Sequence, residues 1–176
     1  MGLFKEAVPK ALRVGVLWDV DQEGTENFFK EYEISARAQN IPLHSLEVRG
    51  PKPDIEMAFK SAIKGRVDAL IVVRSPKLRR EAKRILELVI KYRLPCMCEG
   101  TDFVEAGCMM SYSTSDTESF RRAATYVDKI IKGRKPADLP VERPMKFEFV
   151  INLKTAKQIG LNIPQSVLFR ADRVIQ

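Results

Sequence analysis

Several polar and aromatic side chains of this sequence stand directly after short apolar segments, where a ligand could meet them. They are Trp18, Asp19, Arg74, Ser75, Glu99, Thr101, Tyr112 and Ser115. An acidic residue such as Asp19 or Glu99 could bind an ammonium group, and the two aromatic side chains could stack on a ring. Ser75 and Ser115 stand at predicted helix starts, whose free N–H groups suit a carboxylate or another anion. These residue types favour the binding of a small polar solute, such as an amino acid.

Each of these residues also has a purely structural interpretation, and both interpretations stay open at this point. Ser75 and Ser115 are good N-caps whether or not a ligand is present. Asp19 could stabilise the turn that follows it, Glu99 could pair with a nearby arginine, and Trp18 could belong to the core. We therefore expect only part of this set to contact a ligand.

The usual catalytic and nucleotide-binding motifs are missing from the sequence. There is no GxGxxG, P-loop, GxSxG or HExxH pattern, and with a single histidine no nucleophile–base pairing is evident. The loop 19–25 offers only Thr25 as a hydroxyl, which argues against a flavodoxin-like flavin carrier. The sequence therefore predicts a protein that is not an enzyme and holds no cofactor.

The three cysteines raise the question of a metal or disulfide site. Cys96 and Cys98 form a C-x-C pattern on a predicted strand, and we expect their side chains to point to opposite faces of the sheet. The lone His44 lies on another predicted strand. Three closely grouped cysteines are also too few for a disulfide framework. We expect buried, inert thiols and no metal site.

Apolar segments of strand length alternate with amphipathic helices five times before residue 134. The predicted strands are 13–19, 43–48, 69–73, 95–98 and 108–112, and the predicted helix caps include Asp54, Ser75 and Ser115. Segment 69–73 has no polar alternation, which is typical of a strand covered on both faces in a parallel sheet. This rhythm predicts an α/β fold with a doubly wound parallel five-stranded sheet. Such sheets bind ligands outside the carboxyl ends of their strands, where the eight residues stand.

The last 42 residues do not continue this spacing. Segment 135–144 holds three prolines and is predicted to be an extended connector. A strand at 147–151, a short helix that Asn152 caps and Gly160 ends, and one last helix at 164–175 should follow. We therefore expect an α/β ligand-binding lobe at 1–134, with 1–12 as the remnant of a preceding helix, and a hinge connector and C-terminal tail at 135–176.

The charge of the chain indicates no special class of partner. The net charge is +7, and the basic residues are scattered apart from a cluster at 79–84 that lacks interleaved aromatic residues. We expect no nucleic-acid binding. No apolar run is long enough to span a bilayer, so we expect no membrane insertion. The amino terminus shows no signal-peptide pattern, so a chain that is complete as written would be cytoplasmic.

Longer motifs run through nearly the whole chain. They are KALRVGVLWD at 10–19, RVDALIV at 66–72, YRLP at 92–95, FVEAG at 103–107, MSY at 110–112, RRAATYVDKI at 121–130, PADLPVE at 136–142, KFE at 146–148 and VINLKTAK at 150–157. These motifs resemble the ABC-transporter substrate-binding protein family. The resemblance is to the branch with a type I periplasmic-binding fold, some of whose members bind aromatic amino acids.

The resemblance implies a second lobe that this sequence does not match. Family members clamp a solute between two lobes joined by hinge crossings, after export to the periplasm or to a lipid-anchored extracytoplasmic position. This chain matches only the flavodoxin-like second lobe and the C-terminal tail. The implied partners are a small-molecule ligand, an ABC permease, and either the missing N-terminal lobe or a homodimer partner.

A chain without the first lobe should leave apolar side chains of the tail uncovered. We expect this of Phe147, Phe149, Ile151, Leu153 and Ile159. Such a patch favours association with a second copy, so we predict a dimer. A stand-alone sensory or dimerisation module of the same fold, with no enzymatic activity, is the alternative function.

Overall fold

The chain folds around a single mixed sheet of seven strands. A computed structural model describes all residues from Met1 to Gln176. The strand order is β2-β1-β3-β4-β5-β6-β7. The first five strands are β1 (Val14–Asp19), β2 (Leu43–Val48), β3 (Ala69–Val72), β4 (Cys96–Cys98) and β5 (Met110–Thr114). Every neighbouring pair among these five is parallel, so the predicted α/β class and parallel core are confirmed.

Helices connect these strands and bury one stripe each against the sheet or a neighbouring helix. They are α2 (Thr25–Arg37), α3 (Ile55–Lys64), α4 (Pro76–Arg80), α5 (Ala82–Tyr92) and α6 (Thr101–Glu105). The predicted cap of α3 is present, because the Asp54 carboxylate accepts the Met57 N–H at 2.8 Å. Phe59 of α3 stacks on Tyr92 of α5 with ring centroids 6.1 Å apart, which packs these two helices together.

Two helices depart from the sequence prediction. The single helix expected from Ser75 to about Arg93 is divided into α4 and α5, because the backbone at Glu81 turns out of helical geometry. The short helix α6 was not predicted at all. Its five residues are too few to establish a helical period in the sequence.

The C-terminal segment joins the same sheet. Strand β6 (Phe147–Asn152) pairs antiparallel with β5, and β7 (Arg173–Ile175) pairs parallel with β6. Helix α8 (Leu153–Gln158) begins at the predicted cap, where Asn152 accepts the Thr155 N–H at 3.1 Å. The helix predicted at 164–175 is wrong, because only α9 (Gln165–Leu168) is helical there and the chain then extends into β7.

The tail residues that we expected to be uncovered are largely buried. Phe149, Ile151 and Ile159 are 2%, 0% and 7% exposed, so the expectation is wrong for these three. The physical reason is that β6 pairs with β5 and adds its apolar side chains to the main core. The short helix α1 (Gly2–Ala7) also packs on this end of the molecule, where Glu6 pairs with Arg170.

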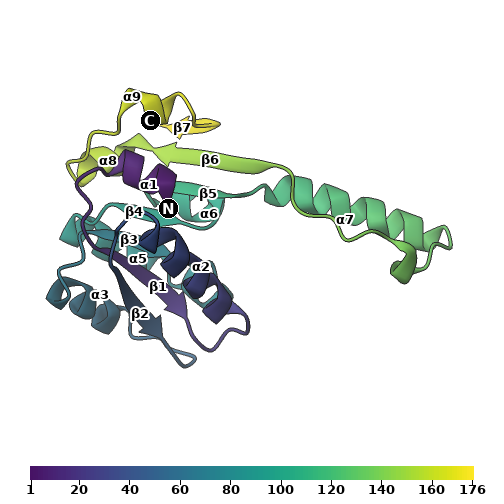
Figure 1. The fold of residues 1–176 in the computed structure, drawn as a ribbon, viewed down its shortest axis with the longest axis horizontal. Coiled ribbons are helices and arrows are strands. Elements are labelled where there is room, and N and C mark those ends of the chain that lie inside the picture. Colours follow the sequence, from purple (N-terminus) through teal and green to yellow (C-terminus); the bar gives the residue numbers. More distant parts are fainter.

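A long arm projects from the sheet and consists of residues 116–146 (Figure 1). It contains α7 (Asp116–Ile131), the 3-10 turn η1 (Pro136–Asp138) and an extended return to β6. Helix α7 was predicted, but no residue of it is buried, and Phe120 and Ile131 are 76% and 79% exposed. The boundary expected after residue 134 falls inside this arm, while the sheet continues on both sides of it.

None of the helices combines the length and the apolar character that crossing a membrane requires.

Candidate functional site

A cleft of about 480 Å³ opens at the sheet edge where the parallel strands end, and we call it the rim cleft. Its walls include Phe28 and Tyr32 of α2 and Phe147 of β6. Three of the eight predicted site residues line it, namely Arg74, Glu99 and Tyr112. Such a position outside the carboxyl ends of parallel strands is where α/β folds bind ligands.

A hydrogen-bonded network of charged groups forms one wall of the rim cleft. The Tyr32 hydroxyl donates to Glu99 Oε1 at 2.6 Å, and the Arg74 backbone N–H donates to Glu99 Oε2 at 2.9 Å. The Arg74 guanidinium holds both carboxylate oxygens of Asp116, at 3.0 and 2.7 Å. Asp116 is the first residue of α7, so this ion pair also ties the arm to the sheet.

The neighbouring charges in this wall shift the pKa values of its side chains. Its hydrogen bonds to Asp116 raise the pKa of Arg74, and the same bonds lower the pKa of Asp116. Burial, reinforced by the charge of Glu99, raises the pKa of Tyr32. At neutral pH the wall therefore presents a guanidinium, a carboxylate and an un-ionised phenol.

Aromatic rings form the opposite wall. Tyr112 stacks on Phe147 with ring centroids 5.4 Å apart and 10° between the planes, and its ring meets Phe149 edge-on at 6.3 Å. Tyr112 and Phe147 remain 42% and 45% exposed, although they belong to neighbouring strands. An exposed stacked pair beside a charged wall can bind a ligand that carries both an apolar surface and polar groups.

Trp18 and Asp19 lie at the same edge but are occupied by protein partners. Trp18 stacks on Phe29 at 5.1 Å, and its indole N–H donates to the Ser45 hydroxyl at 2.8 Å. The Lys77 ammonium lies 2.7 Å from carboxylate oxygens of both Asp19 and Asp21. Burial alone would lower the pKa of Lys77, but the hydrogen bonds to the two carboxylates raise it overall. Trp18 is thus a core residue and Asp19 half of a buried ion pair.

Sequence reasoning missed Lys77, the partner of Asp19. The only signal was a lysine in the first turn after the Ser75-Pro76 helix start. The two residues of the pair are 58 positions apart, and no local pattern joins them.

Ser75, Ser115 and Thr101 serve local structure. Ser75 accepts the Leu78 N–H at 3.0 Å and Ser115 accepts the Glu118 N–H at 3.4 Å, so both are N-caps as predicted. Thr101 is the first residue of α6 and does not line the rim cleft. The hydroxyl groups of Ser75 and Ser115 thus accept hydrogen bonds from the first turns of their own helices.

The cysteines form a cluster that corrects the sequence prediction. Cys98 and Cys108 form a disulfide with their Cα atoms 6.5 Å apart, and Cys96 is a free, buried thiol. The expectation of opposite faces was wrong, because residues two apart on a strand share a face. The expectation of free thiols was wrong for Cys98 and Cys108, which the fold brings together, and holds only for the buried Cys96. His44 contacts Ser61 instead.

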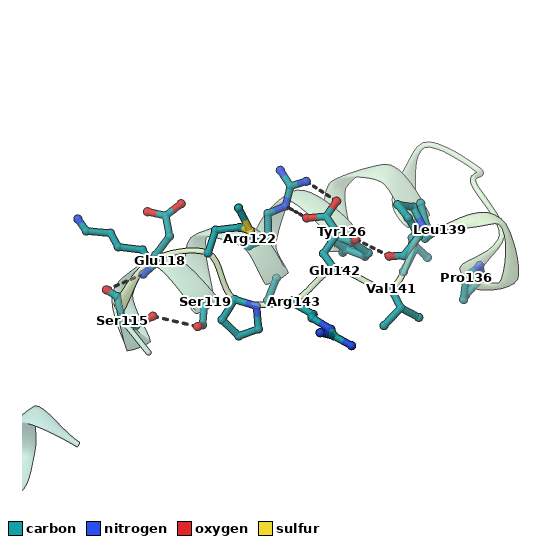
Figure 2. A pocket seen from close by; sticks show the side chains of 16 residues that line it. Ser115, Glu118, Ser119, Arg122, Tyr126, Pro136, Leu139, Val141, Glu142 and Arg143 are labelled. Atoms are coloured by element: carbon teal, nitrogen blue, oxygen red, sulfur yellow. Dashed lines mark hydrogen bonds and ion pairs between the residues drawn. The ribbon is translucent and has the colours of Figure 1, made fainter. Parts of the chain in front are cut away.

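A second, larger cleft belongs to the arm alone. It measures about 690 Å³ and lies between α7 and the extended return (Figure 2). Figure 2 shows the two segments joined by ion pairing of Arg122 with Glu142 and by the Tyr126 hydroxyl, which donates to the Pro140 carbonyl at 2.6 Å. This cleft is lined by Val141 and Met145, which are almost fully exposed, so it belongs to a surface with no cover from the rest of the chain.

Three solved structures share this fold over almost the whole chain. A conserved domain protein from Vibrio cholerae has a TM-score of 0.88 and 24% identity over 98% of this chain and 58% of its own. An ABC domain from Streptococcus pneumoniae, described in complex with L-Trp, has a TM-score of 0.86 and 23% identity over 99% and 60%. A ligand-free, open substrate-binding protein with adhesive properties from Clostridium difficile has a TM-score of 0.75 and 16% identity over 99% and 58%.

The chain therefore spans about three fifths of the length of these structures. No curated protein matches the sequence. The family model for ABC transporter substrate binding proteins matches residues 1–175, a range that includes all the motifs on which the resemblance was based. The chain belongs to the ABC transporter substrate-binding protein family.

Proposed function

We propose that this chain is the solute-binding component of an ABC importer, or the C-terminal lobe of one, and that the rim cleft is its half of the solute site. The observation that carries the proposal is the juxtaposition of the Arg74–Glu99 wall with the Tyr112–Phe147 ring pair at the carboxyl edge of the sheet. The family membership supports the same role.

The ligand that best fits this half-site is a small polar solute of the amino acid class. Arg74 and Glu99 both line the rim cleft and bring opposite charges close together, which suits a zwitterion. The exposed face of Tyr112 offers stacking to a side chain. The L-Trp in the Streptococcus pneumoniae neighbour is consistent with this class.

The other half of the site is proposed to come from a further lobe. The similar structures are longer than this chain, and the arm carries an apolar face that nothing here covers. A lone lobe encloses less of a ligand and should bind it weakly. In the whole protein, closure of two lobes around the solute would shift the population toward a form that the permease recognises, with no bond made or broken.

We further propose that the whole protein works outside the cytoplasm, in the periplasm or on a lipid anchor. The disulfide between Cys98 and Cys108 supports this location, because disulfides persist in oxidising compartments. The alternative function is a stand-alone sensory or dimerisation module, in which a second copy covers the apolar face of α7. The full gene separates the two: an upstream signal peptide and first lobe support transport, whereas a fused kinase or cyclase supports the sensory module.

A binding experiment tests the rim cleft directly. Amino acids, nucleosides and small acids are screened by thermal shift against the full-length gene product, and the affinity of the best ligand is measured by calorimetry. Tyr112→Ala should weaken binding roughly two- to tenfold, since an aromatic contact is worth about 0.5–1.5 kcal/mol. Phe169→Ala removes an exposed ring outside the cleft and serves as the matched control. Equal affinity of the two variants would place the solute elsewhere.

A further inference from the structure

Three sulfur atoms meet inside the sheet, and one of them is within reach of both others. Cys108, in the turn before β5, is disulfide-bonded to Cys98. The Cys96 Sγ lies 3.3 Å from the same Cys108 Sγ. All three sulfur atoms lie within 4.8 Å of one another, and all three residues are fully buried.

We propose that this cluster is a disulfide-exchange site, in which Cys108 pairs with either Cys98 or Cys96. In the exchange, the Cys96 thiolate attacks Cys108 Sγ, the Cys96–Cys108 bond forms and the Cys98–Cys108 bond breaks. Cys98 leaves as a thiolate and takes up the proton that Cys96 lost. One thiol and one disulfide are present before and after, so the step consumes no oxidant and no reductant.

Because the three cysteines are buried, they can react with one another but not with molecules in solution. All three residues are 0% exposed, so an external thiol or metal ion does not reach their sulfur atoms in the folded chain. Burial raises the pKa of the Cys96 thiol to about 12, and the Met109 N–H, which donates to Cys96 Sγ at 3.3 Å, opposes this rise. The Cys96 thiol is therefore protonated at neutral pH, which makes the exchange slow. The Cys96 and Cys108 sulfur atoms still lie in contact.

The exchange changes which part of β4 is held. In the observed pairing the tie is at Cys98, the residue before Glu99, whose carboxylate joins the wall of the rim cleft. The alternative pairing moves the tie back by two residues, which is about 7 Å along a strand. The cysteine pairing therefore sets how firmly the end of β4 holds Glu99. Any effect of the pairing on solute binding rests on the proposed function, whereas the existence of the two pairings does not rest on it.

Disulfide mapping of variants that each lack one of the three cysteines tests the proposal. Wild type, Cys98→Ala and Cys96→Ala are folded in an oxidising glutathione buffer, quenched with acid, and mapped by mass spectrometry of non-reduced peptides. Cys98→Ala should form the Cys96–Cys108 bond in most molecules, and Cys96→Ala, the matched control, should keep the Cys98–Cys108 bond. Two free thiols in Cys98→Ala, under conditions that fully oxidise the control, would overturn the proposal.

A measurement on the unaltered chain decides the question if Cys98→Ala does not fold. Wild type is incubated natively at pH 9, quenched at successive times, and the partner of Cys108 is identified. A growing fraction of Cys96–Cys108 peptide is expected, and exclusive Cys98–Cys108 pairing at all times would refute the exchange. Neither measurement uses a ligand, so both can fail while the proposed solute site stands.

Discussion

Replacing Lys77 by methionine should destabilise this protein more than any other single substitution at the edge of the sheet where the parallel strands end. Lys77 is the only cation that contacts Asp19, and the side chains of the pair are 11% and 5% exposed. Methionine keeps most of the length of the lysine side chain but removes its charge. The carboxylate of Asp19 would then be buried at the end of β1 without its counter-ion.

The size of the effect follows from the burial of this pair. Removing one partner of a buried ion pair costs about 3–5 kcal/mol, because the remaining charge is left uncompensated. Lys77 also reaches Asp21, whose side chain is 47% exposed, so water approaches the edge of the pair. The lower end, about 3 kcal/mol, therefore applies. In a chain of this length such a loss lowers Tm by roughly 6–12 °C.

Urea denaturation followed by circular dichroism measures this loss, and a double variant identifies its cause. Adding Asp19→Asn to Lys77→Met removes the stranded charge, so the double variant should recover at least half of the lost stability. An Asp21→Asn variant serves as the control for the exposed contact and should differ little from wild type. If Lys77→Met unfolds within about 1 kcal/mol of wild type, the buried pair does not stabilise the edge as argued.

Three further predictions concern the arm, the helix caps and the disulfide. Arg74→Ala removes the ion-pair partner of Asp116, so amide hydrogen exchange across residues 116–146 should quicken while that of the sheet is unchanged. The pair lowers the pKa of Asp116. The stabilisation by this pair is therefore present above the ordinary carboxyl pKa of about 4 and is lost as the pH falls below it. In urea, Asp54→Ala should cost about 1 kcal/mol, and Asn152→Ala about 2–3 kcal/mol, since its buried amide also donates to a carbonyl of α6. Reducing the disulfide, whose cysteines are 10 residues apart, should cost about 3 kcal/mol of unfolding free energy, read from urea midpoints with and without reductant.

Local patterns were sufficient to predict most of the parallel sheet. The segments that became β1, β2 and β3 were located to within one residue. For β1 and β3, which are buried along their whole length, the reason is that a strand covered on both faces needs an uninterrupted apolar segment. The caps at Asp54, Ser75 and Ser115 were also predicted, since a cap depends on residues only three positions apart.

Pairings between distant segments decided the rest. The arm has the amphipathic pattern of a packed helix, yet only the extended return of the arm lies against α7, so no residue of this helix is buried. The segment at 173–175 is a strand because β6 offers it a partner, and its own residues gave no such signal.

The sequence by itself determined which residues gather at one edge of the sheet, and the tertiary structure decided which of them are still available. Trp18 and Asp19 are bound by Ser45 and Lys77, which come from other elements of the chain. Tyr112 stacks on Phe147 and still remains 42% exposed. The positions of the strands along the chain follow from local apolar runs, but whether a side chain is left without a protein partner depends on neighbours that only the folded chain brings near. For this reason Arg74, Glu99 and Tyr112 line the rim cleft, whereas Trp18 and Asp19, placed at the same edge by the sequence, do not.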